Sequence, residues 1–74
     1  MNEQPTTKPG LKVGQRWLLR IFRSATHTRY YIHNPDLLEC LNLGYARKIP
    51  NSRKGATELY EITDEGINAL YLHP

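Results

Sequence analysis

The segment from Leu37 to Leu70 limits the fold of this chain more than any other feature. It reads LLECLNLGYARKIPNSRKGATELYEITDEGINAL. Residues 45–49 and 58–62 contain the aromatic and β-branched side chains that favour strands. The turn-forming residues between them are Pro50, Asn51, Ser52 and Gly55. Because Thr63 can cap a helix that begins directly afterwards, the segment predicts a hairpin clamped between two helices.

Helical spacing and capping signals predict the elements before the hairpin. Residues 11–25 predict a helix whose apolar face consists of Val13, Trp17, Leu18, Ile21 and Phe22. On that helix Leu19 should be partly exposed. Residues 28–33 predict a strand. Asn34 and Pro35 predict the start of a second helix, which Gly44 should end in the left-handed conformation.

These elements predict an α+β fold. The expected order is helix, strand, helix, strand, strand, helix, with a three-stranded antiparallel sheet. The last helix should bury Ile67, Leu70 and Tyr71. A chain of 74 residues has the length of one domain, which we place at residues 11–74. Residues 1–10 are polar, contain two prolines and predict a disordered tail.

The net charge of +3 conceals a strong segregation of charge along the chain. Residues 1–33 hold six cations and one carboxylate, and residues 47–57 hold four cations and no carboxylate. The intervening residues 34–46 and the final residues 58–74 hold only carboxylates. Alternating blocks of this kind indicate distinct basic and acidic patches, which suit macromolecular partners.

Two sets of basic residues are the candidate binding sites. Lys12, Arg16, Arg20 and Arg23 fall within about 80° of one another around the first helix. Such a stripe suits phosphates or an acidic protein surface, or it is the solvated face of an amphipathic helix. The second set surrounds the turn of the hairpin and comprises Arg47, Lys48, Arg53 and Lys54. It suits the same partners, or it guards the hairpin against edge pairing.

The residue pattern predicts a binding protein and no enzyme. No nucleophile–base pair or glycine-rich phosphate loop stands out, and the three histidines show no metal-ligand spacing with the single cysteine, Cys40. We therefore expect neither a metal nor a cofactor. One cysteine and no long apolar run favour a cytoplasmic protein without a membrane segment.

Residues 38–70 resemble the second half of a bacterial winged-helix domain. The matching motifs are Leu38-x-x-Leu41 before Gly44-Tyr45, the basic loop Asn51-Ser52-Arg53-Lys54-Gly55, and Tyr60-x-Ile62-Thr63-x-x-Gly66 before Leu70. The resemblance implies that the helix before the hairpin enters the major groove of DNA. It also implies that the loop, or wing, contacts phosphate or the minor groove.

The chain departs from the winged-helix pattern at two points. Residues 26–33 predict a strand where a second helix is expected, and the helix at 35–43 carries Asp36 and Glu39 but no cation. Carboxylates facing phosphates oppose the electrostatic attraction that dominates non-specific DNA affinity. These departures favour a protein partner over the reading of bases.

The size, charge blocks and shortened winged-helix pattern look like those of phage-encoded regulators that bind the host RNA polymerase. We therefore expect a small monomeric transcription regulator, in the cytoplasm of a bacterial host, that inhibits initiation or alters termination. The alternative is a winged-helix repressor whose basic wing binds the DNA phosphate backbone. A third possibility is an inhibitor of another host enzyme.

Overall fold

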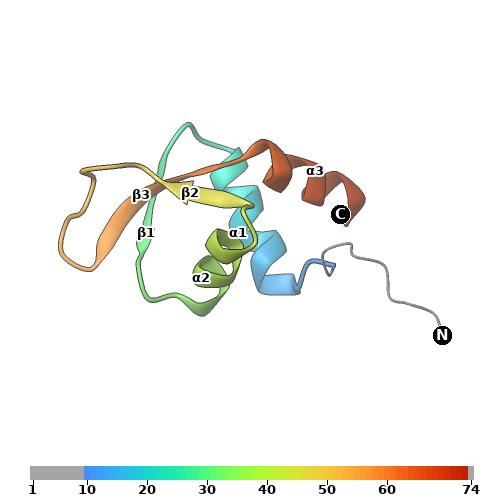
Figure 1. Cartoon of the computed structure of the whole chain (residues 1–74), viewed down its shortest axis with the longest axis horizontal. Coiled ribbons are helices and arrows are strands. Elements are labelled where there is room, and N and C mark those ends of the chain that lie inside the picture. The colour runs from blue at the N-terminus through green and yellow to red at the C-terminus, as the bar shows by residue number, and fades with distance from the viewer. Residues whose placement is uncertain (1–9, 74) are drawn as a thin grey trace.

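The computed structural model describes residues 10–73 and confirms the α+β class and the expected order of elements (Figure 1). The elements are α1 (Val13–Arg23), β1 (Thr28–Tyr31), α2 (Pro35–Asn42), β2 (Ala46–Lys48), β3 (Thr57–Ile62) and α3 (Asp64–Leu72). Apart from Gly10, the tail expected at residues 1–10 lies outside the described range.

The three strands form one antiparallel sheet in the order β1-β3-β2, as predicted for the strand number and direction. Strand β3 is central. Its residue Tyr60 lies between Thr28 of β1 and Lys48 of β2, and Glu61 lies opposite Arg47. The hairpin connection projects to one end of the molecule, away from α3 (Figure 1).

The predicted helix signals are present as hydrogen bonds and dihedral angles. The Asn34 side chain accepts a hydrogen bond from the Leu37 amide at 3.0 Å, and Pro35 follows as the first helical residue. The Thr63 hydroxyl accepts one from the Gly66 amide at 3.1 Å. Gly44 has a φ of 80°, which only glycine adopts without strain. These residues therefore fix where α2 and α3 begin and where α2 ends.

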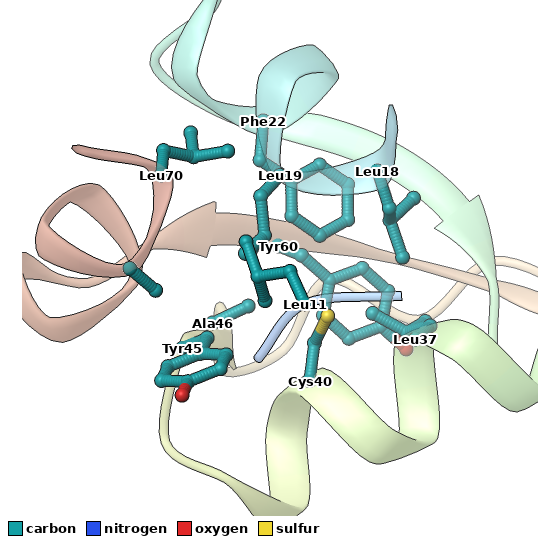
Figure 2. Close-up of a cluster of buried hydrophobic side chains, with 11 residues drawn as sticks. Leu11, Leu18, Leu19, Phe22, Leu37, Cys40, Tyr45, Ala46, Tyr60 and Leu70 are labelled. Carbon is teal, nitrogen blue, oxygen red and sulfur yellow. The ribbon is translucent and has the colours of Figure 1, made fainter. Parts of the chain in front are cut away.

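The core gathers on the face of the sheet that carries Tyr60, which is only 1% exposed. The Tyr60 ring stacks on Phe22 of α1 with ring centroids 6.0 Å apart. All three helices contribute to this cluster, in part through Leu37, Cys40 and Leu70 (Figure 2). The opposite face of the sheet carries Arg29, Tyr31 and other polar or exposed side chains.

The expected apolar face of α1 was wrong by about a quarter turn. Trp17 is 64% exposed and Val13 is 66% exposed, whereas Leu19 is fully buried. The reason is that α1 contacts α2, α3 and β3 at once, so the packed arc is centred on Leu18, Leu19 and Phe22. Polar Gln15 can share this arc because its amide is hydrogen-bonded to the Lys12 amide and to Glu39.

The expected burial of Tyr71 was also wrong, since this residue is 79% exposed. Helix α3 instead buries Gly66, Ala69 and Leu70. A Cβ added to Gly66 would overlap the Tyr45 carbonyl oxygen and lie 2.7 Å from Cγ1 of Ile62. The first turn of α3 therefore lies directly on backbone at the start of the hairpin, and this contact fixes which side of α3 faces the core.

Replacing Gly66 with alanine should destabilise the fold although alanine favours helices. Overpacking against a backbone oxygen, which cannot move aside as a side chain can, costs up to about 3 kcal/mol, and alanine recovers about 1 kcal/mol of helix propensity, so we expect a net loss of about 1–2 kcal/mol. Urea unfolding followed by circular dichroism measures the change. Asn68→Ala, at an exposed position of the same helix, should be neutral or slightly stabilising. Equal midpoints for Gly66→Ala and the parent protein would contradict this contact.

Candidate functional site

The hairpin connection ends in a tight turn built from its own backbone and side chains. Lys54 and Thr57 exchange two backbone hydrogen bonds, of 2.8 and 3.1 Å, around Gly55 and Ala56. Gly55 has a φ of 59°, and the Thr57 hydroxyl donates to the Lys54 carbonyl at 2.8 Å. The Arg53 Nε donates to the Gly55 carbonyl at 2.7 Å. The turn therefore presents Arg53 and Lys54 from a defined backbone.

Two further contacts hold the base of the connection. The Ser52 hydroxyl donates to the Ile49 carbonyl at 2.6 Å and accepts from the Leu59 amide at 3.0 Å, so it joins the two arms of the hairpin. From β1, Arg29 Nη1 donates to the Ser52 carbonyl at 3.1 Å and to the Thr57 hydroxyl at 3.0 Å. A cation from a strand distant in sequence is thus fixed beside the turn.

Tyr31 lies on the same face of the sheet as Arg29. Tyr31 pairs with Thr57 across the strands, and Thr57 also pairs with Lys54 in the turn. The Tyr31 ring and the Lys54 ammonium group therefore flank Thr57. Side chains that pair across antiparallel strands project from the same face. Tyr31 is 66% exposed. We call the four exposed side chains Arg29, Tyr31, Arg53 and Lys54 the tip patch.

The tip patch is positively charged and has few competing carboxylates. The nearest acidic residue on β3, Glu58, accepts a hydrogen bond from the Tyr60 hydroxyl at 3.3 Å and faces Lys48 Nζ at 4.0 Å. Burial, followed by the charge of Glu58, raises the pKa of Tyr60. Glu58 is therefore already engaged within the fold, whereas the Lys54 side chain has no polar partner among residues 10–73.

The other two basic residues of the hairpin lie on opposite faces of the sheet, and each is close to a carboxylate. Arg47 forms an ion pair with Glu61, directly across the strands. Lys48 lies on the core-facing side, near Glu58. The four basic residues predicted as one hairpin site therefore divide into Arg53 and Lys54 at the turn and Arg47 and Lys48 beside carboxylates on the strands.

The basic stripe predicted on the first helix also divides. Lys12 precedes α1 and reaches Glu39 of α2 at 3.5 Å. Arg16 is half-buried, and its guanidinium donates to the His73 carbonyl at 3.3 Å and to the Leu11 carbonyl at 3.5 Å. A cation at the carboxyl end of α3 interacts favourably with the dipole of that helix. Lys12 and Arg16 thus connect elements of the fold.

Arg20 and Arg23 are exposed, and their side chains have no polar partner within the described part of the chain. Trp17 and Val13 are exposed on the same helix, which holds no carboxylate. We call Val13, Trp17, Arg20 and Arg23 the α1 outer face. It is the second surface at which exposed arginines and a large aromatic side chain occur together.

The two carboxylates of α2 point toward α1. A Cβ added to Gly14 would overlap the Asp36 carboxylate, which shows how closely the two helices approach there. Glu39 accepts a hydrogen bond from Gln15 and pairs with Lys12. The exposed residues of α2 include Leu38 and Asn42, which are uncharged. Glu39 is therefore paired within the fold, whereas Asp36 lies against α1 without a hydrogen bond or ion pair among residues 10–73, and α2 holds no cation.

Arg53, Lys54, Arg20 and Arg23 were among the binding residues predicted from the sequence. Arg29 was not among them, and Trp17 was predicted to lie on the buried face of the first helix. The position of Arg29 beside the turn depends on the strand order, in which β1 pairs with β3 rather than standing alone. The exposure of Trp17 depends on which arc of α1 the other elements cover. The sequence did contain one signal for this exposure, because Trp17 adjoins arginines that recur at spacings of three and four.

Residues 10–73 contain no group of three or more histidine, cysteine or acidic side chains that could hold a metal ion. Within the same range, no helix has the length and apolar character needed to cross a membrane. No protein-family model, curated protein or solved structure matches the chain.

Cys40 is fully buried, and burial, with smaller contributions from Asp36 and Glu39, raises the pKa of its thiol to about 12. An unfolded chain ionises this thiol near pH 9, whereas the folded protein retains the proton. The stability that Cys40 contributes should thus be complete below pH 9 and fall as pH rises toward 12, by about 1.4 kcal/mol per pH unit.

Urea unfolding between pH 8 and pH 10.5 tests this dependence by comparing the parent protein with Cys40→Ala. Below pH 9 the variant is less stable than the parent protein because the substitution leaves a cavity. The difference between the two proteins should shrink as the pH rises above 9. Parallel curves across the range would show that Cys40 ionises alike in the folded and unfolded states.

Proposed function

We propose that this chain is a small, non-enzymatic transcription regulator whose tip patch binds the phosphate backbone of a nucleic acid. The observation that carries this proposal is the convergence of Arg29, Arg53 and Lys54 around one turn, next to exposed Tyr31. Cations supply most of the affinity of non-specific nucleic-acid binding, and an exposed aromatic ring can stack on an unpaired base.

The fold supports this proposal at the level of its arrangement. A basic hairpin turn follows a short helix and precedes a capped helix, as the winged-helix resemblance implies. However, strand β1 occupies the stretch between α1 and α2, where a winged helix has a further helix. Helix α2 also exposes no arginine, lysine or glutamine, and Asn42 is its one exposed side chain of a type that reads base edges. We therefore propose phosphate contact at the tip patch with little preference for sequence.

Binding of a fluorescent 20-base-pair duplex, measured by anisotropy at 50 and 200 mM salt, tests the tip patch. Three phosphate contacts predict a slope of log K against log salt of about −2.7, which corresponds to an affinity loss of about 40-fold over this range. Arg53→Ala combined with Lys54→Ala should reduce the slope to about −0.9 and weaken binding alike for unrelated sequences.

The matched control is Arg20→Ala combined with Arg23→Ala, which removes the same charge from the α1 outer face. Its affinity should remain close to that of the parent protein. Equal losses in the two double variants would show a diffuse charge effect rather than a site. Binding that does not respond to salt would contradict phosphate contact altogether.

A second candidate function is binding to the RNA polymerase of a bacterial host, and the α1 outer face favours it. Trp17 is exposed beside Arg20, and tryptophan and arginine are enriched among the residues that dominate protein–protein affinity. A nucleic-acid contact at the tip patch and a polymerase contact at α1 are compatible, because the patches occupy different elements.

Affinity capture from bacterial lysate, followed by mass spectrometry, tests the polymerase candidate. The parent chain should retain polymerase subunits, and Trp17→Ala should retain few, because its substitution removes the largest exposed side chain of the α1 outer face. Nuclease treatment of the lysate removes capture through DNA. Absence of polymerase subunits from the parent sample would exclude this partner.

A further inference from the structure

The α1 outer face combines exposed apolar surface with unpaired positive charge. Val13 and Trp17 are among the large apolar side chains that the fold leaves uncovered. At 100° per residue, Trp17 and Arg20 project within about 60° of each other, with Val13 between them. Arg23 continues the basic side one turn further along. A partner lying along α1 would therefore meet both kinds of surface at once.

A depression of about 280 Å³ adjoins this face on the side away from Arg23. Trp17, Leu18, Ile21 and Tyr30 supply apolar walls. Asn34 and Asp36 line the depression too, and Asp36 lies near Gly14, toward the amino end of α1. The depression is large enough for one bulky apolar side chain, and its wall opposite α1 comes from β1 and the start of α2.

We propose that the α1 outer face docks an acidic, amphipathic segment of another protein. The segment crosses α1: it inserts an aromatic or long aliphatic side chain into the depression beside Trp17, and its carboxylates face Arg20 and, further round the helix, Arg23. Because Asp36 repels negative charge at the other end, the acidic residues lie toward the carboxyl end of α1. This inference deepens the second candidate function by naming the chemistry of the partner.

Charge and shape favour this occupant over a nucleic acid. Helix α1 holds no carboxylate, so Arg20 and Arg23 attract negative charge from outside. Phosphates would satisfy the arginines and a base could stack on Trp17, but the apolar depression would be left without a matching apolar group. They would also approach the Asp36 carboxylate. An acidic segment with a large apolar side chain satisfies all three features together.

Selection from a random 12-residue peptide library displayed on phage tests the proposal with the intact chain as bait. Selected peptides should be enriched in aspartate and glutamate around one aromatic or leucine residue. Trp17 is the single tryptophan of the chain, so its fluorescence reports directly on this face. Synthetic copies of the selected peptides should shift its emission to shorter wavelength, and copies with lysine at the acidic positions should not.

Matched variants locate the binding site by anisotropy of a labelled peptide. Trp17→Ala should weaken binding about 30-fold or more, as expected for a residue that dominates an interface. Arg20→Ala with Arg23→Ala should weaken it about 10-fold and make it less sensitive to salt. Arg53→Ala with Lys54→Ala, at the tip patch, should leave it unchanged. Circular dichroism confirms that each variant is folded.

Several outcomes would overturn the proposal. These are the absence of acidic enrichment, equal peptide affinity for the parent protein and Trp17→Ala, and a Trp17 shift produced by duplex DNA instead of peptide. Concentration-dependent dimerisation that Trp17→Ala abolishes would assign the face to a second copy of this chain. If peptides bind as expected but no polymerase is captured from lysate, the proposed chemistry of the partner is supported and only its identification as RNA polymerase is rejected.

Discussion

The packing of Tyr60 against Phe22 is the contact on which the rest of the structure depends. Tyr60 lies on the central strand, so its position is fixed by hydrogen bonding to β1 on one side and β2 on the other. Its ring meets α1 through Phe22 and belongs to one core with residues of α2 and α3. This buried face leaves the opposite face of the sheet and the hairpin turn free for polar and aromatic side chains. The tip patch exists because β3 joins β1, which supplies Arg29 and Tyr31, to the turn, which supplies Arg53 and Lys54.

Local signals made much of the fold predictable. Asn34, Gly44 and Thr63 act through their own backbone or through residues three positions away, so the sequence near each of them contains the necessary information. The arc of α1 that faces the core was not predictable in this way. It depends on three elements packing around one helix, and a polar residue, Gln15, becomes acceptable there only because Glu39 and the Lys12 amide satisfy it.

The charge pattern was informative about residue types but not about pairing. Four cations gather around the hairpin in sequence, yet Arg47 and Lys48 lie next to Glu61 and Glu58 once the strands pair. Likewise, the carboxylates of α2 seemed to repel a nucleic acid, whereas Asp36 and Glu39 lie against α1. The main objection to DNA at α2 is therefore that the helix holds no arginine or lysine and exposes Asn42 as its one base-reading side chain. Nucleic-acid contact at the turn and protein contact at α1 are therefore separate proposals, each with its own residues.

We propose that the tip patch and the α1 outer face are distinct surfaces with distinct ligands. The most direct measurement is a backbone NMR titration of the isotopically labelled chain with duplex DNA at low salt. The amide shifts should concentrate on Arg29, Tyr31, Arg53 and Lys54, and those of Trp17 and Arg20 should remain unchanged. Shifts centred on Pro35–Asn42, or spread equally over α1 and the hairpin, would contradict it.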